Sequence, residues 1–67
     1  MTNLFTPAKT VELELEGLDG NAFALMGAFA RQARKEQWSK NDTDLVMKAC
    51  QEGDYDNLIA TLVAHCE

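Results

Sequence analysis

Two cysteines and one histidine are the side chains of this 67-residue sequence that could act as nucleophiles, as a general base or as metal ligands. Cys50 and Cys66 do not form a CxxC pair, and His65 has no cluster of zinc-ligand spacing around it. His65 directly precedes Cys66, but neighbours on a helix diverge by ~100° and do not face each other. A chain this short also lacks room for a substrate pocket beside its core. We therefore predict no catalytic residue, no metal site, no cofactor and no small-molecule substrate.

A loop with a glycine at each end, residues 17–20, precedes the first expected helix, and its amides could in principle hold an anion. The carboxylate of Asp19 would occupy the same positive helix end, and no Lys, Ser or Thr follows as a P-loop requires. We interpret Asp19 as the N-cap of the helix, with Asn21 as the second candidate. If Asp19 is the cap, Leu18 and Phe23 have the spacing of a hydrophobic staple.

The charges suggest where a partner could bind. Six basic and eleven acidic residues give a formal net charge of -5, which disfavours attraction to nucleic-acid phosphates or anionic lipid. The possible partner face consists of three glutamates and three bases: Glu12, Glu14, Glu16, Arg31, Arg34 and Lys35. Each group also fits a solvated surface, and an acidic row that imitates nucleic acid stays open as well.

The pattern of apolar residues predicts four elements in a single domain, residues 9–67. Strict alternation predicts a half-buried strand from Lys9 to Glu16. Helical periodicity predicts helices over about 22–37, 41–51 and 55–66. Residues 1–8 show no period and form either a flexible N-terminal arm or a tail that packs on the domain.

Three residues mark the expected boundaries of the later helices. Ser39 and Asp54 stand where the N-caps of the second and third helices belong. Gly53 tolerates the left-handed conformation that commonly ends a helix, so we expect it to end the second one.

A single strand cannot satisfy its own backbone hydrogen bonds and needs a mate. We predict that a second copy of the chain supplies it, in an antiparallel two-stranded ribbon that buries Val11, Leu13 and Leu15 of both chains. The expected fold class is therefore α+β, one strand followed by three helices, in a homodimer. The alternative is a two-stranded sheet within one chain that uses the N-terminal tail at residues 3–5; residues 63–67 could also supply a mate, but their pattern fits the end of a helix better.

The order of elements resembles that of ribbon-helix-helix DNA-binding proteins over residues 9–51. That family presents polar or basic side chains to the bases, whereas this strand carries Glu12, Glu14 and Glu16, which phosphates repel. The motifs GLDGNAF (residues 17–23) and GDYDNL (residues 53–58) together resemble short proteins of bacteria, phages and mobile elements. This resemblance implies a phage or mobile-element setting and transfers no activity.

We expect a non-enzymatic, cytoplasmic protein that binds a host protein as an adaptor or inhibitor. No apolar run approaches the ~18 residues that a membrane span needs, so no membrane partner is expected. The competing hypothesis is a regulator of ribbon-helix-helix-like architecture that binds nucleic acid through its bases, Arg31, Arg34, Lys35 and Lys40.

Overall fold

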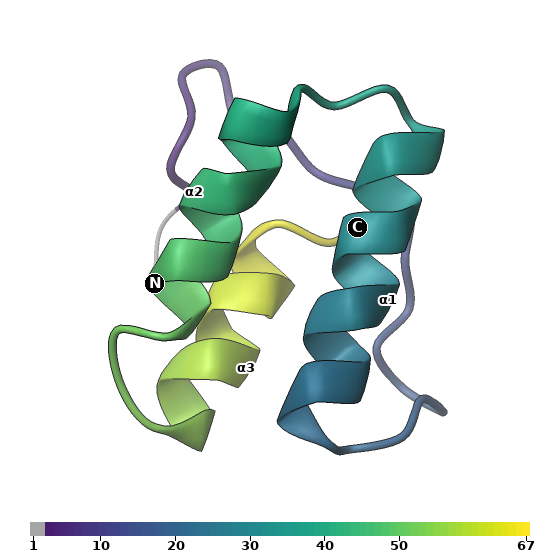
Figure 1. Cartoon of the computed structure of the whole chain (residues 1–67), viewed down its shortest axis with the longest axis vertical. Helices are drawn as coiled ribbons and strands as arrows, with labels where there is room; N and C mark the ends of the chain where they lie inside the picture. Colours follow the sequence, from purple (N-terminus) through teal and green to yellow (C-terminus); the bar gives the residue numbers. More distant parts are fainter. Residues whose placement is uncertain (1–2) are drawn as a thin grey trace.

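The computed structural model describes residues 3–67 and folds them around three α-helices (Figure 1). These are α1 (Ala22–Lys35), α2 (Lys40–Cys50) and α3 (Tyr55–Ala64). The described residues form no strand or sheet beyond one isolated bridge, so the predicted strand and its intermolecular ribbon are wrong. The domain is all-α, with an extended N-terminal segment packed against the helices.

The missing mate of the extended segment is the chain's own C-terminus. Val11 forms a parallel bridge with Cys66. The Val11 N–H donates to the His65 carbonyl at 2.9 Å, and the Val11 carbonyl accepts from the Glu67 N–H at 2.9 Å. Because both backbone groups of Val11 are satisfied within one chain, the argument that required a twin molecule fails.

Residues 9–16 alternate between apolar and polar side chains because one side of this segment packs on the helices, and not because the segment pairs in a sheet. Val11 is completely buried, and Leu13 and Leu15 are half-buried against the core. The glutamates between them are exposed. In Figure 1 the segment passes behind α2 and runs beside α1 to the loop before that helix. The period of two therefore indicates one buried side of an extended chain. Val11, Leu13 and Leu15 do not form the predicted dimer ribbon.

The N-terminus of α1 is capped by Asn21, the second of the two predicted candidates. Its side chain accepts from the N–H groups of Phe23 and Ala24. Asp19 instead accepts from the N–H of Asn21, at 3.0 Å, so its prediction as the cap is wrong. The cap two residues later removes the staple spacing, because Phe23 now follows the cap by only two residues. Phe23 is consequently 80% exposed.

The C-terminus of α1 is closed by a Schellman motif that uses glutamine where glycine is usual. Gln37 has a φ of 66°, in the left-handed region. The Trp38 N–H donates to the Ala33 carbonyl at 2.9 Å, and the Gln37 N–H donates to the Arg34 carbonyl at 3.0 Å. This turn places Trp38 over the junction between α1 and α2.

The predicted N-caps of α2 and α3 are confirmed. The Ser39 side chain accepts from the Asp42 N–H, and the Asp54 side chain accepts from the Asn57 N–H. In both turns the cap satisfies an N–H group that has no partner within the helix.

Gly53 follows α2 for a reason other than the predicted one. Gly53 does not adopt the left-handed conformation: among residues 3–67 the glycine with a positive φ is Gly17. Helix α2 already ends at its C-cap, Gln51. A Cβ at position 53 would lie 2.9 Å from the Cβ of Asn57. Asn57 must sit there because its side chain also donates to the Ala49 carbonyl, which ties α3 to α2. The glycine thus provides space for this contact.

The core joins all three helices to the extended segment. Phe29 and Leu62 are its largest fully buried apolar side chains. The buried hydrophobic residues are Val11, Leu25, Phe29, Ala33, Val46, Ala49, Cys50, Leu58 and Leu62.

Residues 3–8 lie against the domain, while Met1 and Thr2 of the predicted arm lie outside the described residues. The Phe5 ring packs edge-on against Trp38 and His65, with centroids 5.5 and 5.8 Å away. The Lys9 ammonium lies 4.5 Å from the Trp38 ring centroid and 2.6 Å from an Asp42 carboxylate oxygen. These contacts match the alternative in which the tail packs on the domain through Phe5.

Candidate protein-interaction groove

The predicted acidic face is divided by the fold. Glu12, Glu14 and Glu16 are all exposed on the extended segment. Glu14, Glu16 and Glu67 border a groove that Glu12 does not line, and the Glu67 carboxylate accepts from the Thr10 hydroxyl at 3.2 Å. The Glu12 N–H instead donates to the Glu36 carboxylate at 2.8 Å, which fastens the segment to the end of α1.

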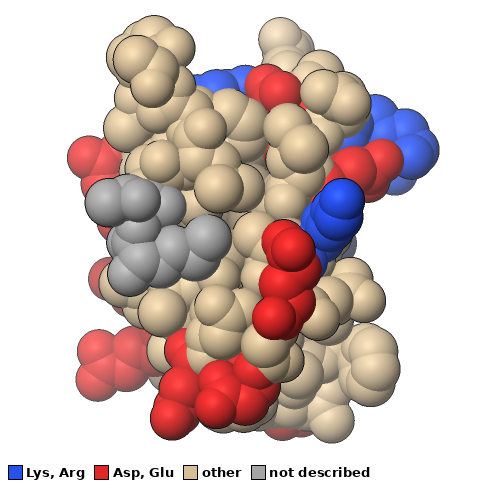
Figure 2. Space-filling view, turned by 90° about the vertical axis from the view of Figure 1, so that its left-hand side faces the viewer, with Lys and Arg blue, Asp and Glu red and all other residues tan. Residues whose placement is uncertain are grey.

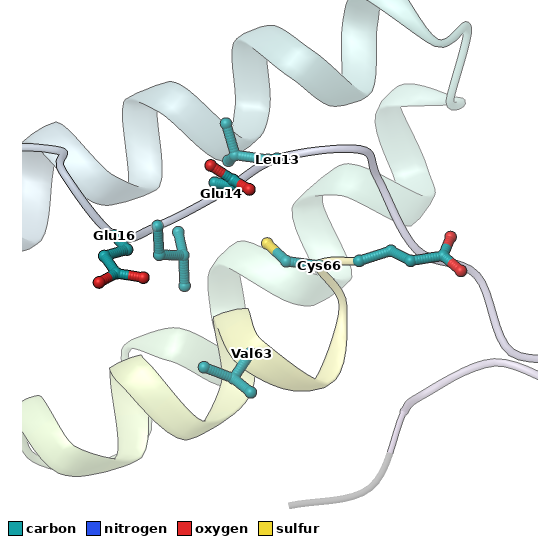
Figure 3. A pocket seen from close by; sticks show the side chains of 7 residues that line it. Leu13, Glu14, Glu16, Val63 and Cys66 are labelled. Carbon is teal, nitrogen blue, oxygen red and sulfur yellow. The ribbon is translucent and has the colours of Figure 1, made fainter.

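This groove lies between the extended segment and the C-terminal end of α3 (Figure 3). Its volume is about 250 Å³. We name it the acidic groove; its lining residues are Leu13, Glu14, Leu15, Glu16, Val63, Cys66 and Glu67. In Figure 3 the sulfur of Cys66 faces the extended segment. The groove combines an apolar floor with three acidic lining residues, of which Glu67 is also bound by Thr10, and none of its described lining residues is basic.

The backbone beside the acidic groove has unused hydrogen-bonding groups. In this stretch the Leu13 N–H donates to the Val11 carbonyl, and the Leu18 N–H donates to the Leu15 carbonyl. Within residues 3–67, the N–H groups of Glu14, Leu15 and Glu16 have no such partner. Glu16 begins the turn that the Leu18 N–H to Leu15 carbonyl bond closes, and successive N–H groups of an extended chain point to opposite sides. One added chain could therefore pair with Glu14 or with Leu15, but not with all three residues.

Cys66 is held in a form unsuited to nucleophilic chemistry. Burial raises the pKa of Cys66 to about 11, and the Glu36 carboxylate adds to the rise. Burial likewise raises the pKa of Cys50 to about 11, with a further contribution from Cys66. The thiolate is the reactive species, so both thiols stay protonated and unreactive at neutral pH.

His65 does not assist Cys66. Its buried ring lies with Nδ1 2.7 Å from the Thr61 carbonyl, while Nε2 accepts from the Leu4 N–H at 3.0 Å. These two contacts require the proton on Nδ1. Nδ1 thus holds the ring on α3, and Nε2 fastens the N-terminal segment to it. Neither nitrogen is free to take a proton from Cys66.

The predicted bases lie at a different place from the acidic groove. Arg31, Arg34 and Lys35 are exposed in the second half of α1. Arg34 and Lys40 border a second hollow, of about 270 Å³, beside Trp38. The Lys40 ammonium is already paired with Asp44, at 2.8 Å. The bases line no described part of the acidic groove, although Glu36, the residue after Lys35, binds the Glu12 N–H.

The sequence pattern did not identify three residues of the acidic groove. Val63, Cys66 and Glu67 join the acidic groove only because the C-terminus folds back onto Val11. Val63 is one of the regularly spaced apolar residues that predict the third helix, and such spacing indicates a buried face, yet it is 58% exposed. Residues 63–67 follow the helical pattern, so the sequence favours a helix end there over the observed pairing with Val11.

The described residues contain no group of three His, Cys, Asp or Glu side chains that could hold a metal ion. No helix in the described part of the chain is long and apolar enough to cross a membrane. Comparisons with protein-family models, curated proteins and solved structures found no match to this chain.

Proposed function

We propose that this protein is a non-enzymatic binding protein whose acidic groove takes up an extended, basic segment of a partner protein. The observation that carries the proposal is the coincidence of three features at one place. These are backbone N–H groups at Glu14 and Leu15 without a backbone partner, an apolar floor, and three acidic lining residues with no base among the described ones.

Each feature selects one property of the partner. The free N–H groups suit an extended chain that lies beside Glu14 and Leu15 and accepts a hydrogen bond from one of them. The apolar floor, which includes Leu13, Leu15 and Val63, suits alternate apolar side chains of that segment. Lysine or arginine at the intervening positions would meet Glu14, Glu16 and Glu67.

The resemblance of the two sequence motifs to short proteins of phages and mobile elements supplies the biological setting of the proposal. In that setting the partner is a host protein in the cytoplasm, and occupation of the groove makes this chain an adaptor or an inhibitor. No activity of the bound partner enters the proposal.

The test uses three short synthetic peptides and the whole protein. In the first peptide Lys and Val alternate, in the second Ser replaces Val, and in the third Glu replaces Lys. Isothermal titration should detect binding of the Lys-Val peptide alone. Changing Glu14 and Glu16 together to Gln should weaken it about fivefold, since exposed ion pairs contribute up to about 1 kcal/mol each.

The matched control is Glu12→Gln, because Glu12 lies on the same extended segment but outside the groove. It removes one negative charge and should leave the affinity nearly unchanged. Equal weakening by Glu12→Gln, or equal binding of the Lys-Ser peptide, would reduce the interaction to general charge attraction and contradict the proposal.

A nucleic-acid-binding role is the second candidate, because Arg34 and Lys40 border one hollow and Arg31 and Lys35 stand on the same half of α1. It does not use a ribbon, which the fold lacks. A mobility-shift assay at low ionic strength tests it with duplex and single-stranded DNA and RNA. A shift that Arg34→Gln weakens would support this role, and the absence of any shift would remove it.

A further inference from the structure

The end of the bundle where α1 and α3 begin carries an exposed apolar surface that the acidic groove does not include. Phe23 is 80% exposed, the highest value among the large hydrophobic side chains described. Leu18 and Tyr55, at 40% and 48%, are exposed in the adjoining loop and in the first turn of α3. The Tyr55 hydroxyl donates to the Gly20 carbonyl, which ties the loop to α3.

Phe23 borders a hollow between α1 and the connection from α2 to α3. Its volume is about 320 Å³. Ala22, Met26 and Leu58 line it together with Phe23 and Tyr55. The hollow shares no lining residue with the acidic groove. A methionine beside two exposed aromatic rings is a surface that can adapt to apolar side chains of a partner.

The charges around this hollow have one sign. Asp54 is the charged residue among its described lining residues. Glu52 lies next to the lining residues Gln51 and Gly53, and the loop before α1, residues 17–21, contains Asp19 and no Lys or Arg. Asp56 follows in the first turn of α3. Figure 2 shows acidic side chains gathered at the lower end of the molecule, where Figure 1 places the start of α3. An apolar patch with an acidic border complements an apolar patch with a basic border.

We infer that this end of the bundle docks an amphipathic helix of a partner protein, with an apolar stripe flanked by Lys and Arg. A helix satisfies its own backbone, so it requires only side-chain contacts from the surface. The Phe23 hollow provides such contacts from α1 and α3, whereas the acidic groove provides unpaired backbone N–H groups. The two surfaces therefore select different partner segments.

The probe is a synthetic helical peptide of Leu and Lys with the leucines on one face, compared with a scrambled peptide of the same composition. Isothermal titration should show binding of the amphipathic peptide only. Phe23→Ser should weaken it about tenfold, as expected for an exposed aromatic anchor. Leu45→Ser is the control, because Leu45 is 45% exposed on α2 and lines none of the three hollows.

Circular dichroism should show unchanged helix content in Phe23→Ser, because the removed ring is mostly in solvent. A second variant, Asp56→Lys, reverses a charge in the first turn of α3, next to the lining residue Tyr55, without altering the apolar floor and should also weaken binding. Unchanged affinity in Phe23→Ser, or equal binding of the scrambled peptide, would overturn the inference. A concentration-dependent dimer in sedimentation that Phe23→Ser abolishes would also overturn it, because the surface would then belong to a second copy. Glu14→Gln with Glu16→Gln should leave this peptide's affinity unchanged, which separates the inference from the proposed function.

Discussion

Val11 and Cys66 lie side by side in a parallel bridge that closes the chain on itself. The Val11 N–H reaches the His65 carbonyl and the Glu67 N–H reaches the Val11 carbonyl, both at 2.9 Å. Val11 is completely buried among the helices. This one contact makes a second molecule unnecessary for the extended segment, and it brings Cys66 and Glu67 to the acidic groove.

Replacing Val11 by Ala should destabilise the protein by about 2 kcal/mol, because two buried methyl groups are removed and a small cavity remains. The matched control is Leu45→Ala at an exposed position of α2, which should cost less than about 0.5 kcal/mol. Urea unfolding followed by circular dichroism measures both. A cost for Val11→Ala no larger than that of the control would mean that the segment does not dock as described.

Replacing Gln37 by Gly should stabilise the protein by about 0.5–1 kcal/mol, since glycine adopts a positive φ without the penalty of a side chain. The same change at Gln32, which lies inside α1, should instead destabilise it by about 1 kcal/mol. Thermal unfolding of the two variants gives the comparison. Destabilisation by Gln37→Gly would contradict the Schellman motif at the end of α1.

Stability should fall at alkaline pH through the two cysteines. Burial lifts both pKa values from an ordinary 9.0 to about 11, so the folded state holds the thiol protons more tightly than the unfolded chain. This contribution is fully present below pH 9.0 and is lost as pH rises through about 11. Changing both cysteines to Ala should make the unfolding free energy less dependent on pH over that range. An unchanged dependence would place both thiols in water.

The neutral ring of His65 should carry its proton on Nδ1, because Nε2 accepts from the Leu4 N–H. Nitrogen chemical shifts of the ring, recorded in alkaline solution, distinguish the two tautomers. The Nε2–H tautomer would show that residues 3–5 do not dock on α3 as described. His65→Ala should release this segment and raise the hydrogen-exchange rate of the Leu4 and Phe5 amides.

The sequence predicted the helices well because their signals are local. Ser39 and Asp54 cap the helices that they precede, since a short side chain needs only the next turn to act. Asp19 and Asn21 both had the right chemistry for a cap, and the choice between them depended on tertiary packing. With Asn21 as the cap, Phe23 loses the spacing of a hydrophobic staple and is exposed.

The extended segment could not be assigned from its own pattern. Alternation of Val11, Leu13 and Leu15 with glutamates requires one buried side, and helices can cover that side as well as a sheet can. What decided the outcome was the contact of Val11 with residues 65–67, more than fifty positions along the chain. The predicted interaction residues Glu14 and Glu16 are consequently exposed, as expected, but beside Val63 and Glu67 and not across a two-fold axis.

The most direct test of the proposed function is a nuclear magnetic resonance titration of the isotope-labelled protein with the Lys-Val peptide. Amide signals of residues 13–16, 63 and 66–67 should shift together, while those of Thr43 and Asp44, which line the hollow beside Trp38 and not the acidic groove, stay in place. The variant with Glu14 and Glu16 both changed to Gln should require about fivefold more peptide for the same shifts. Shifts confined to other residues, or none at peptide concentrations that saturate the titration calorimetry signal, would contradict binding in the acidic groove.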